Sequence, residues 1–143
     1  MEFDPLKLEN QLCFPLYACA KEIVKLYKPF LDAINLTYTQ YITMMVLWEH
    51  TTLTVKEMGK HLYLDSGTLT PLLKKLEKEG LVSRLRSAAD EREVNVTLTN
   101  KGTHLRKKAE AIPTKMSSCI NLPANDLIKL HEILHKILKQ IDS

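Results

Sequence analysis

"LDSGTLTPLLKKLEKEGLVSRLRSAADEREVNVTLTNKG", residues 64–102, changes its hydrophobic period along its length. In its first part Leu69, Leu72, Leu73 and Leu76 recur at helical spacing, and Gly80 suits the position just past a helix end. In its last part apolar and polar residues alternate in "VNVTLT" (94–99), which predicts a strand, and "LVSRLR" (81–86) can pair with it. The stretch therefore predicts a helix followed directly by a β-hairpin, with the polar turn "SAADER" (87–92) at its tip.

Two further helices precede this stretch. In "LTYTQYITMMVLWEH" (36–50) Thr37 and Gln40 have capping-box spacing, and in "LTVKEMGKHLYL" (53–64) Thr54 and Glu57 have the same spacing. Two short helices joined by a tight turn and followed by a hairpin are the element order of a winged helix-turn-helix.

Longer helices are predicted at both ends of the chain. The first runs from about Pro5 to Lys28 and carries an apolar arc of roughly 180°, wider than one packing surface requires. From Thr99 to about Cys119 the pattern is helical with an interruption at Pro113, and a last amphipathic helix covers about 122–141. The wide arc indicates that the first helix faces its own core and a second subunit.

Composition favours a helical protein of one domain. The 143 residues are 45% apolar and 26% charged, and four glycines and three phenylalanines suit a turn-rich β-protein poorly. No secretory signal is evident, the most apolar run is too short to cross a bilayer, and three cysteines show no disulfide framework. We expect a cytoplasmic protein with no membrane partner. The net charge of +3 is weak support for nucleic-acid binding.

The helix-hairpin unit carries side chains suited to DNA. Short polar residues at the start of its helix can reach bases, lysines one turn later can neutralise phosphates, and the hairpin adds arginines, with Arg92 near its tip where it can enter a minor groove. The candidates are Asp65, Ser66, Thr68, Thr70, Lys74, Lys75, Arg84, Arg86 and Arg92. Acidic neighbours dilute this charge, so the pattern alone leaves DNA binding and a solvated basic face about even.

Residues 64–102 resemble the DNA-binding core of the MarR family of dimeric bacterial regulators, with "DER" (90–92) at the wing tip especially characteristic. The similarity extends over nearly the whole chain. The resemblance implies a mainly α winged helix-turn-helix homodimer with a small β-hairpin wing. Within a single domain, 1–143, it implies a DNA-binding lobe at about 37–99 and dimerisation helices at about 5–30 and 100–143. It also implies that Ser66, Thr68 and Lys75 act on the recognition helix and that Asp90 and Arg92 act in the wing.

"QLCFPLY" (11–17), "LTYTQY" (36–41) and "LDSGTLTPLLKKLE" (64–77) together resemble the branch that senses organic hydroperoxides and oxidation. By that resemblance Cys13 matches the sensing cysteine, Tyr27 and Tyr38 match tyrosines that reach it across the dimer interface, and Tyr17 is a neighbour. Without the resemblance Cys13 reads as a small core residue. Because the helix is expected to start near Pro5, Cys13 lies beyond its first turn, and phenolic donors rather than the helix dipole are expected to support a thiolate.

The other cysteines have different expected roles. Cys19 is separated from Cys13 by about 9 Å of helical rise, so a bond between the two is not expected, and Cys19 is expected to pack. Cys119 is the candidate resolving cysteine, and the family resemblance implies that it would bond to the Cys13 of the other subunit; trapping of Cys13 by a small thiol is the alternative.

We expect a transcription regulator whose reduced dimer binds a pseudo-palindromic operator duplex and is released when organic hydroperoxides oxidise Cys13. The main alternative is a MarR-type regulator controlled by a small aromatic ligand, with Cys13 only packing. A remote alternative is a zinc protease, because "HEILH" (131–135) matches His-Glu-x-x-His. A third protein ligand is missing there, since Asp142 is the one carboxylate side chain after His135 and Ile141 stands where one protease class has histidine. We therefore expect no enzyme, no metal and no cofactor.

Overall fold

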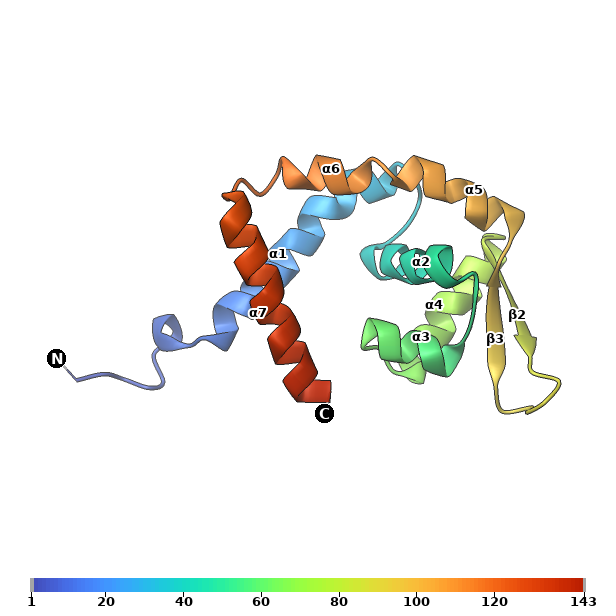
Figure 1. Ribbon diagram of the computed structural model, residues 1–143, viewed down its shortest axis with the longest axis horizontal. Helices are drawn as coiled ribbons and strands as arrows, with labels where there is room; N and C mark the ends of the chain where they lie inside the picture. Colours follow the sequence, from blue (N-terminus) through green and yellow to red (C-terminus); the bar gives the residue numbers. More distant parts are fainter. Residues whose placement is uncertain (1, 143) are drawn as a thin grey trace. The chain divides into compact units, whose positions relative to one another are not determined.

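The computed structural model describes residues 2–142, and these form a mainly helical protein with a small antiparallel sheet, as predicted (Figure 1). The chain divides into two compact units, Met1–Ile112 and Pro113–Ser143. The elements are η1 Leu8–Asn10, α1 Cys13–Asp32, α2 Tyr38–His50, β1 Thr52–Thr54, α3 Val55–Leu62, α4 Ser66–Lys78, β2 Val82–Arg86, β3 Val94–Leu98, α5 Asn100–Ala109, α6 Ile112–Ser117 and α7 Ala124–Asp142.

The core of the first unit lies between α2, α3, α4 and the sheet. Each of these elements buries long apolar side chains completely, because its apolar residues recur at the period of its own secondary structure. The completely buried apolar residues are Met44, Leu47, Met58, Leu69, Leu73, Leu76 and Val96.

Two predicted helix starts have well-formed caps. Thr37 and Gln40 at α2, and Thr54 and Glu57 at α3, exchange both hydrogen bonds of a capping box. The α4 helix ends as predicted at Gly80, which has a φ of 77° and suits glycine. Only a short turn separates the end of α3 at Leu62 from the start of α4 at Ser66.

The sheet has one strand that the sequence did not predict. The strand order is β1-β3-β2, and the predicted hairpin pairs Arg84 with Val96. The short strand β1 pairs antiparallel with β3, with Leu53 opposite Val96, and runs directly into α3. The wing is therefore the far part of a sheet that also contains the residues before α3.

The prediction for the first helix was wrong at both ends. The helix α1 begins at Cys13 instead of Pro5, and it continues through Pro29 to Asp32 instead of ending at Lys28. Before it, side chains bond to the backbone and compete with helix formation: Asn10 donates to the Asp4 carbonyl. Pro15 also fits only a first turn, where its missing N–H costs no intrahelical bond.

The helix expected from Thr99 to Cys119 is two helices, α5 and α6, with the break just before Pro113. In the second unit, α7 buries no residue, and its apolar side chains Leu127, Ile128, Leu130 and Ile133 are exposed. Within residues 2–142, every helix is too short or too polar to cross a membrane.

Candidate functional site

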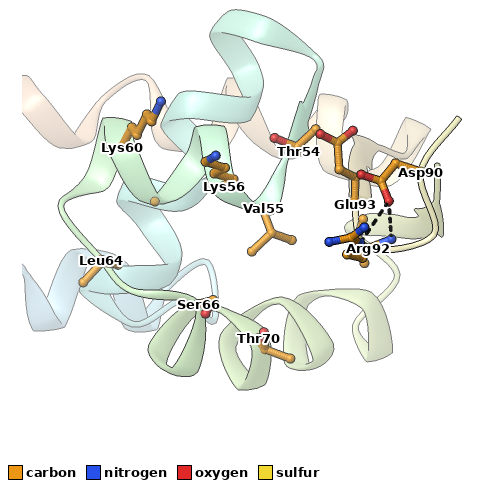
Figure 2. Close-up of a pocket in the computed structure, with 12 residues that line it drawn as sticks. Thr54, Val55, Lys56, Lys60, Leu64, Ser66, Thr70, Asp90, Arg92 and Glu93 are labelled. Carbon is orange, nitrogen blue, oxygen red and sulfur yellow. Dashed lines mark hydrogen bonds and ion pairs between the residues drawn. The ribbon is translucent and has the colours of Figure 1, made fainter.

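A groove of about 700 Å³ lies between α3, the start of α4 and the wing (Figure 2). Ser66 and Thr70 line it from α4, and Asp90 and Arg92 line it from the wing. Ser66 and Thr70 share a flank because they are four residues apart on one helix. The structure thus brings together four of the predicted DNA-binding residues from two parts of the chain.

Asp65 has a structural role at the start of α4. Its carboxylate accepts a hydrogen bond of 2.7 Å from the backbone N–H of Thr68, which caps the helix. This bond to Thr68 holds the pKa of the exposed Asp65 carboxyl below its ordinary value of 3.8. Asp65 therefore fixes the orientation of the helix end that carries Ser66 and Thr68.

The remaining predicted residues of α4 are exposed and point in different directions. At about 100° per residue, Thr68 and Lys75 fall on the flank opposite Ser66 and Thr70, and Lys74 lies nearer the groove side. Lys75 borders a second hollow beside Thr37 at the start of α2. The exposed surface of α4 thus presents hydroxyls near its start and ammonium groups beyond them.

Arg92 projects from the wing tip with its side chain 94% exposed. The Asp90 carboxylate accepts a 3.0 Å hydrogen bond from the backbone N–H of Arg92 and lies 3.8 Å from its Nε. Arg86 donates from Nη1 to the carbonyl of Glu91 at 2.8 Å, which ties the turn to β2. Asp90 and Arg86 therefore shape the turn that presents Arg92.

Arg84 differs from the other arginines of the hairpin. Its side chain is 22% exposed, and its guanidinium lies 3.3 Å from the carboxylate of Glu77 in α4. The structure places Arg84 at the base of the wing, away from its tip.

Sequence reasoning missed Lys56 and Lys60, which line the groove from α3. Figure 2 shows both beside the groove, across from Ser66 and Thr70. The signal was present in the sequence, since two lysines four residues apart lie on one helix face, opposite the apolar stripe that contains the buried Met58.

Cys13 is exposed and is the first residue of α1. The expectation that it lies beyond the first turn was wrong, because the helix starts eight residues later than predicted, at 13 instead of 5. The preceding Leu12 offers no capping side chain, and the first turn contains no acidic residue. The Cys13 thiol therefore lies at a helix start, where the first backbone N–H groups have no partner within the helix.

Tyr17 is one helical turn from Cys13 and is exposed, with the Lys21 ammonium 5.7 Å from its ring centre. Tyr27 lies about 21 Å further along α1 than Cys13, from fourteen residues of helical rise. Within one chain Tyr27 therefore cannot touch Cys13, and a contact requires a second copy.

Three tyrosine rings form a cluster where α1 meets α2. Tyr27 lies 5.0 Å from Tyr38 and 5.8 Å from Tyr41 between ring centres. Burial raises the pKa of Tyr27, and so does Tyr38 beside it. Tyr41 is buried, which raises its pKa too, and its ring centre lies 5.8 Å from that of Tyr27 and 6.3 Å from that of Tyr38. The stretch "LTYTQY" (36–41) contains Tyr41, but no role in this cluster was predicted for it from the sequence.

Cys19 is exposed in the single chain, so packing of its side chain, as expected from the sequence, is not found within one subunit. Cys119 is also exposed and follows α6, where its thiol donates a weak hydrogen bond of 3.6 Å to the Lys115 carbonyl.

The residues of "HEILH" lie on one turn of α7. The rings of His131 and His135 are 4.0 Å apart between centres, and Nδ1 of His135 lies 2.8 Å from the His131 carbonyl oxygen. Within residues 2–142 no group of three His, Cys, Asp or Glu side chains is placed to hold a metal ion.

Comparison with known proteins agrees with this architecture. The family model described as "Transcriptional regulator SarA/Rot" matches residues 25–110. The organic hydroperoxide resistance transcriptional regulator of Bacillus subtilis (strain 168) is 51% identical over 140 residues, which cover 98% of this chain and 95% of the relative.

Two solved structures of AbfR are also similar. Reduced AbfR bound to DNA is 37% identical, with 95% of each chain covered and a TM-score of 0.77. Disulfide-formed AbfR is 35% identical, with 95% of this chain and 93% of AbfR covered and a TM-score of 0.68. The family model and the Bacillus subtilis relative are both named as transcriptional regulators, and AbfR was solved bound to DNA. The chain therefore belongs to the SarA/Rot transcriptional regulators, within the MarR type of winged-helix proteins, and it is a transcription regulator rather than an enzyme.

Proposed function

We propose that this chain is a redox-responsive DNA-binding regulator whose reduced homodimer binds a pseudo-palindromic duplex and is released when Cys13 is oxidised. The observation that carries DNA binding is the groove in which Ser66 and Thr70 of α4 face Arg92 of the wing. Support for a redox response comes from the exposed Cys13 at the start of α1 and from the relative named for organic hydroperoxide resistance.

The α4 helix is suited to the major groove. Its first turns carry Ser66, Thr68 and Thr70, whose hydroxyls bond to base edges or phosphates, while Lys74 and Lys75 lie further along and neutralise phosphates. In this arrangement Arg92 enters the adjacent minor groove. Two copies related by a two-fold axis would read half-sites about one helical turn, ~34 Å, apart.

The oxidation step uses a peroxide. The Cys13 thiolate attacks the distal oxygen of an organic hydroperoxide, the O–O bond breaks, and the alkoxide leaves and takes a proton to become an alcohol. Cys13 is then a sulfenic acid. A second thiolate attacks its sulfur, a disulfide forms, and the hydroxyl leaves as water after taking a proton. We propose Cys119 of the partner subunit as this second thiol, since it is exposed and AbfR has been solved in a disulfide form.

The test is release from a labelled operator duplex by cumene hydroperoxide. Wild-type protein should lose the duplex, Cys13→Ser should keep it, and Cys19→Ser, a matched change on the same helix, should behave as the wild type. Release of the Cys13→Ser protein by hydroperoxide would exclude Cys13 as the sensor.

The disulfide partner is tested on a non-reducing gel. Oxidised wild-type protein should migrate as a covalent dimer, and Cys119→Ser should not. A covalent dimer that persists in Cys119→Ser would exclude Cys119. Loss of the dimer with DNA release that then depends on an added small thiol would assign trapping to that thiol.

A further inference from the structure

The carboxylate of Glu77 joins the recognition helix to the wing at two points. Glu77 lies in the last turn of α4, and its Oε2 accepts a 3.2 Å hydrogen bond from the backbone N–H of Arg84 in β2. Its Oε1 accepts a 3.3 Å hydrogen bond from Nη2 of the same arginine. One oxygen thus holds the strand backbone and the other holds the side chain.

The position of β2 explains why this contact forms. In the sheet β2 is an outer strand, with β3 on one side only. Alternate N–H groups of an outer strand point away from the sheet and need another acceptor. The Arg84 N–H points outward in this way, and Glu77 supplies the acceptor.

Arg84 is not placed to meet a phosphate from solution. Its side chain is mostly covered, and its Nε is buried with no hydrogen-bond partner among residues 2–142. A phosphate contact needs a guanidinium that solvent can reach, as the exposed Arg92 has. The guanidinium of Arg84 therefore binds the Glu77 carboxylate rather than a phosphate.

The contact between Glu77 and Arg84 lies at the base of the hairpin, so a small change of angle there is enlarged at the tip. From Arg84 to the turn after Ser87 the hairpin extends about 13 Å, at roughly 3.3 Å per residue. A tilt of about 10° at the base would therefore move the tip, with Arg92, by about 2 Å over that length. A shift of this size removes a hydrogen bond with a normal length of about 2.9 Å.

We propose that Glu77 and Arg84 are positioning residues, which set the angle between the recognition helix and the wing so that Arg92 and α4 reach the duplex together. This inference rests on the proposed DNA binding and deepens it. Arg84 was predicted to contact DNA; under this proposal it instead positions Arg92, which makes the contact.

The sign of the Glu77 effect separates this role from simple electrostatics. Removing a negative charge from the DNA-binding side should tighten binding if only charge matters. Loss of a positioning contact weakens binding instead. We expect Glu77→Gln to weaken binding about tenfold, because the amide attracts Arg84 far less than a carboxylate does.

The experiment measures the affinity of the full-length protein for a fluorescent duplex selected by the wild-type protein from a random pool, across a range of salt. Glu77→Gln and Arg84→Gln should both weaken binding while the slope of affinity against salt stays at the wild-type value. Arg84→Lys, which keeps a charge for Glu77, should restore most of the affinity. In the wild-type background Arg92→Ala should cost about tenfold, and in either Gln background it should cost much less, because the wing no longer reaches the duplex.

Three results would overturn the inference: tighter binding by Glu77→Gln, a salt slope that falls by about 1 in Arg84→Gln as for a lost phosphate contact, or an Arg92→Ala effect of equal size in every background. Circular dichroism confirms that each variant is folded, and if Arg84→Gln is unfolded, Glu77→Gln and Arg84→Lys carry the same comparison. If the wild-type protein selects no duplex from the pool, the proposed DNA binding itself is wrong, and the positioning role of Glu77 and Arg84 fails with it.

Discussion

Asp65 has a structural role in the helix that we propose reads DNA. Its carboxylate caps α4, so a negative charge lies at the helix end that we propose faces DNA. Ser66 and Thr68, beside it, lie in the first turn of the helix that this cap orders. The cap thus accounts for an acid in a surface suited to DNA.

We predict that Asp65 contributes a pH-dependent part of the stability. Because its pKa is lowered by the bond to Thr68, its contribution is fully present above the ordinary value of 3.8 and is lost as the pH falls through the lower, folded-state value. Asp65→Asn keeps an acceptor but does not titrate. In urea unfolding the wild type should lose its advantage over Asp65→Asn below about pH 4.

Asp65→Ala is the companion variant, since it removes the cap at every pH. It should be less stable than both other proteins at pH 7. Parallel pH curves for the wild type and Asp65→Asn would show that the carboxylate of Asp65 gains nothing from folding.

At the level of the elements, Gly59 sets how closely α3 approaches the turn that leads to α4. A Cβ built on Gly59 would lie 2.7 Å from the carbonyl oxygen of Leu64. A Cβ on Gly67, in the first turn of α4, would meet only the Asp65 carboxylate at 3.4 Å. The two glycines thus differ in what surrounds them, although each lies inside a helix.

We predict that Gly59→Ala costs about 1–3 kcal/mol of unfolding free energy, because the backbone of the turn must move. Gly67→Ala is the matched control and should be neutral or stabilising, since alanine favours helix by up to about 1 kcal/mol. Denaturant unfolding of both variants measures the difference. Equal stabilities would show that the turn accepts the added methyl group.

The elements also show what the sequence could predict. Capping pairs and periodicity located α2, α3, α4 and the hairpin, because local residues determine these features. The strand β1 was missed, since its three residues are stabilised by pairing with Asn95, Val96 and Thr97, more than forty positions away. The start of α1 was missed because apolar spacing continues upstream, although Pro15 marks a first turn.

The candidate site was predictable to a similar degree. The hydroxyls of α4 and Arg92 were found from helix and hairpin geometry. The different environment of Arg84 could not be found, because it depends on where the end of α4 meets β2. The cysteine and tyrosine roles came from resemblance, and the contacts between subunits that they require remain a prediction.

For the whole molecule, exposed apolar faces on α1 and on α7 indicate association of two copies. Leu16 and Leu26 on α1, and Leu127 and Leu130 on α7, are each exposed in the single chain. A monomer seldom leaves such continuous apolar helix faces in water. Both units therefore have surfaces suited to a second copy of the chain.

We predict that Leu130→Glu converts a dimer to a monomer, because a carboxylate would be buried in the interface. Lys136→Glu, on the polar face of the same helix, is the control, and it changes the charge more than Leu130→Glu does. Sedimentation velocity should give a dimer for the wild type and Lys136→Glu. A dimeric Leu130→Glu protein would place this face of α7 outside the interface.

The pairing of β1 with β3 has a mechanical consequence. The strand β1 continues without a break into α3, while β3 is bonded on its other edge to β2. Helix α3 and the sheet that carries the wing are thus tied by backbone hydrogen bonds and move as one unit, while α4 is held against the wing by the Glu77–Arg84 contact. Oxidation of a cysteine must then move α3 and the sheet together. We therefore expect hydrogen exchange at the amides of β3 to be the same before and after oxidation.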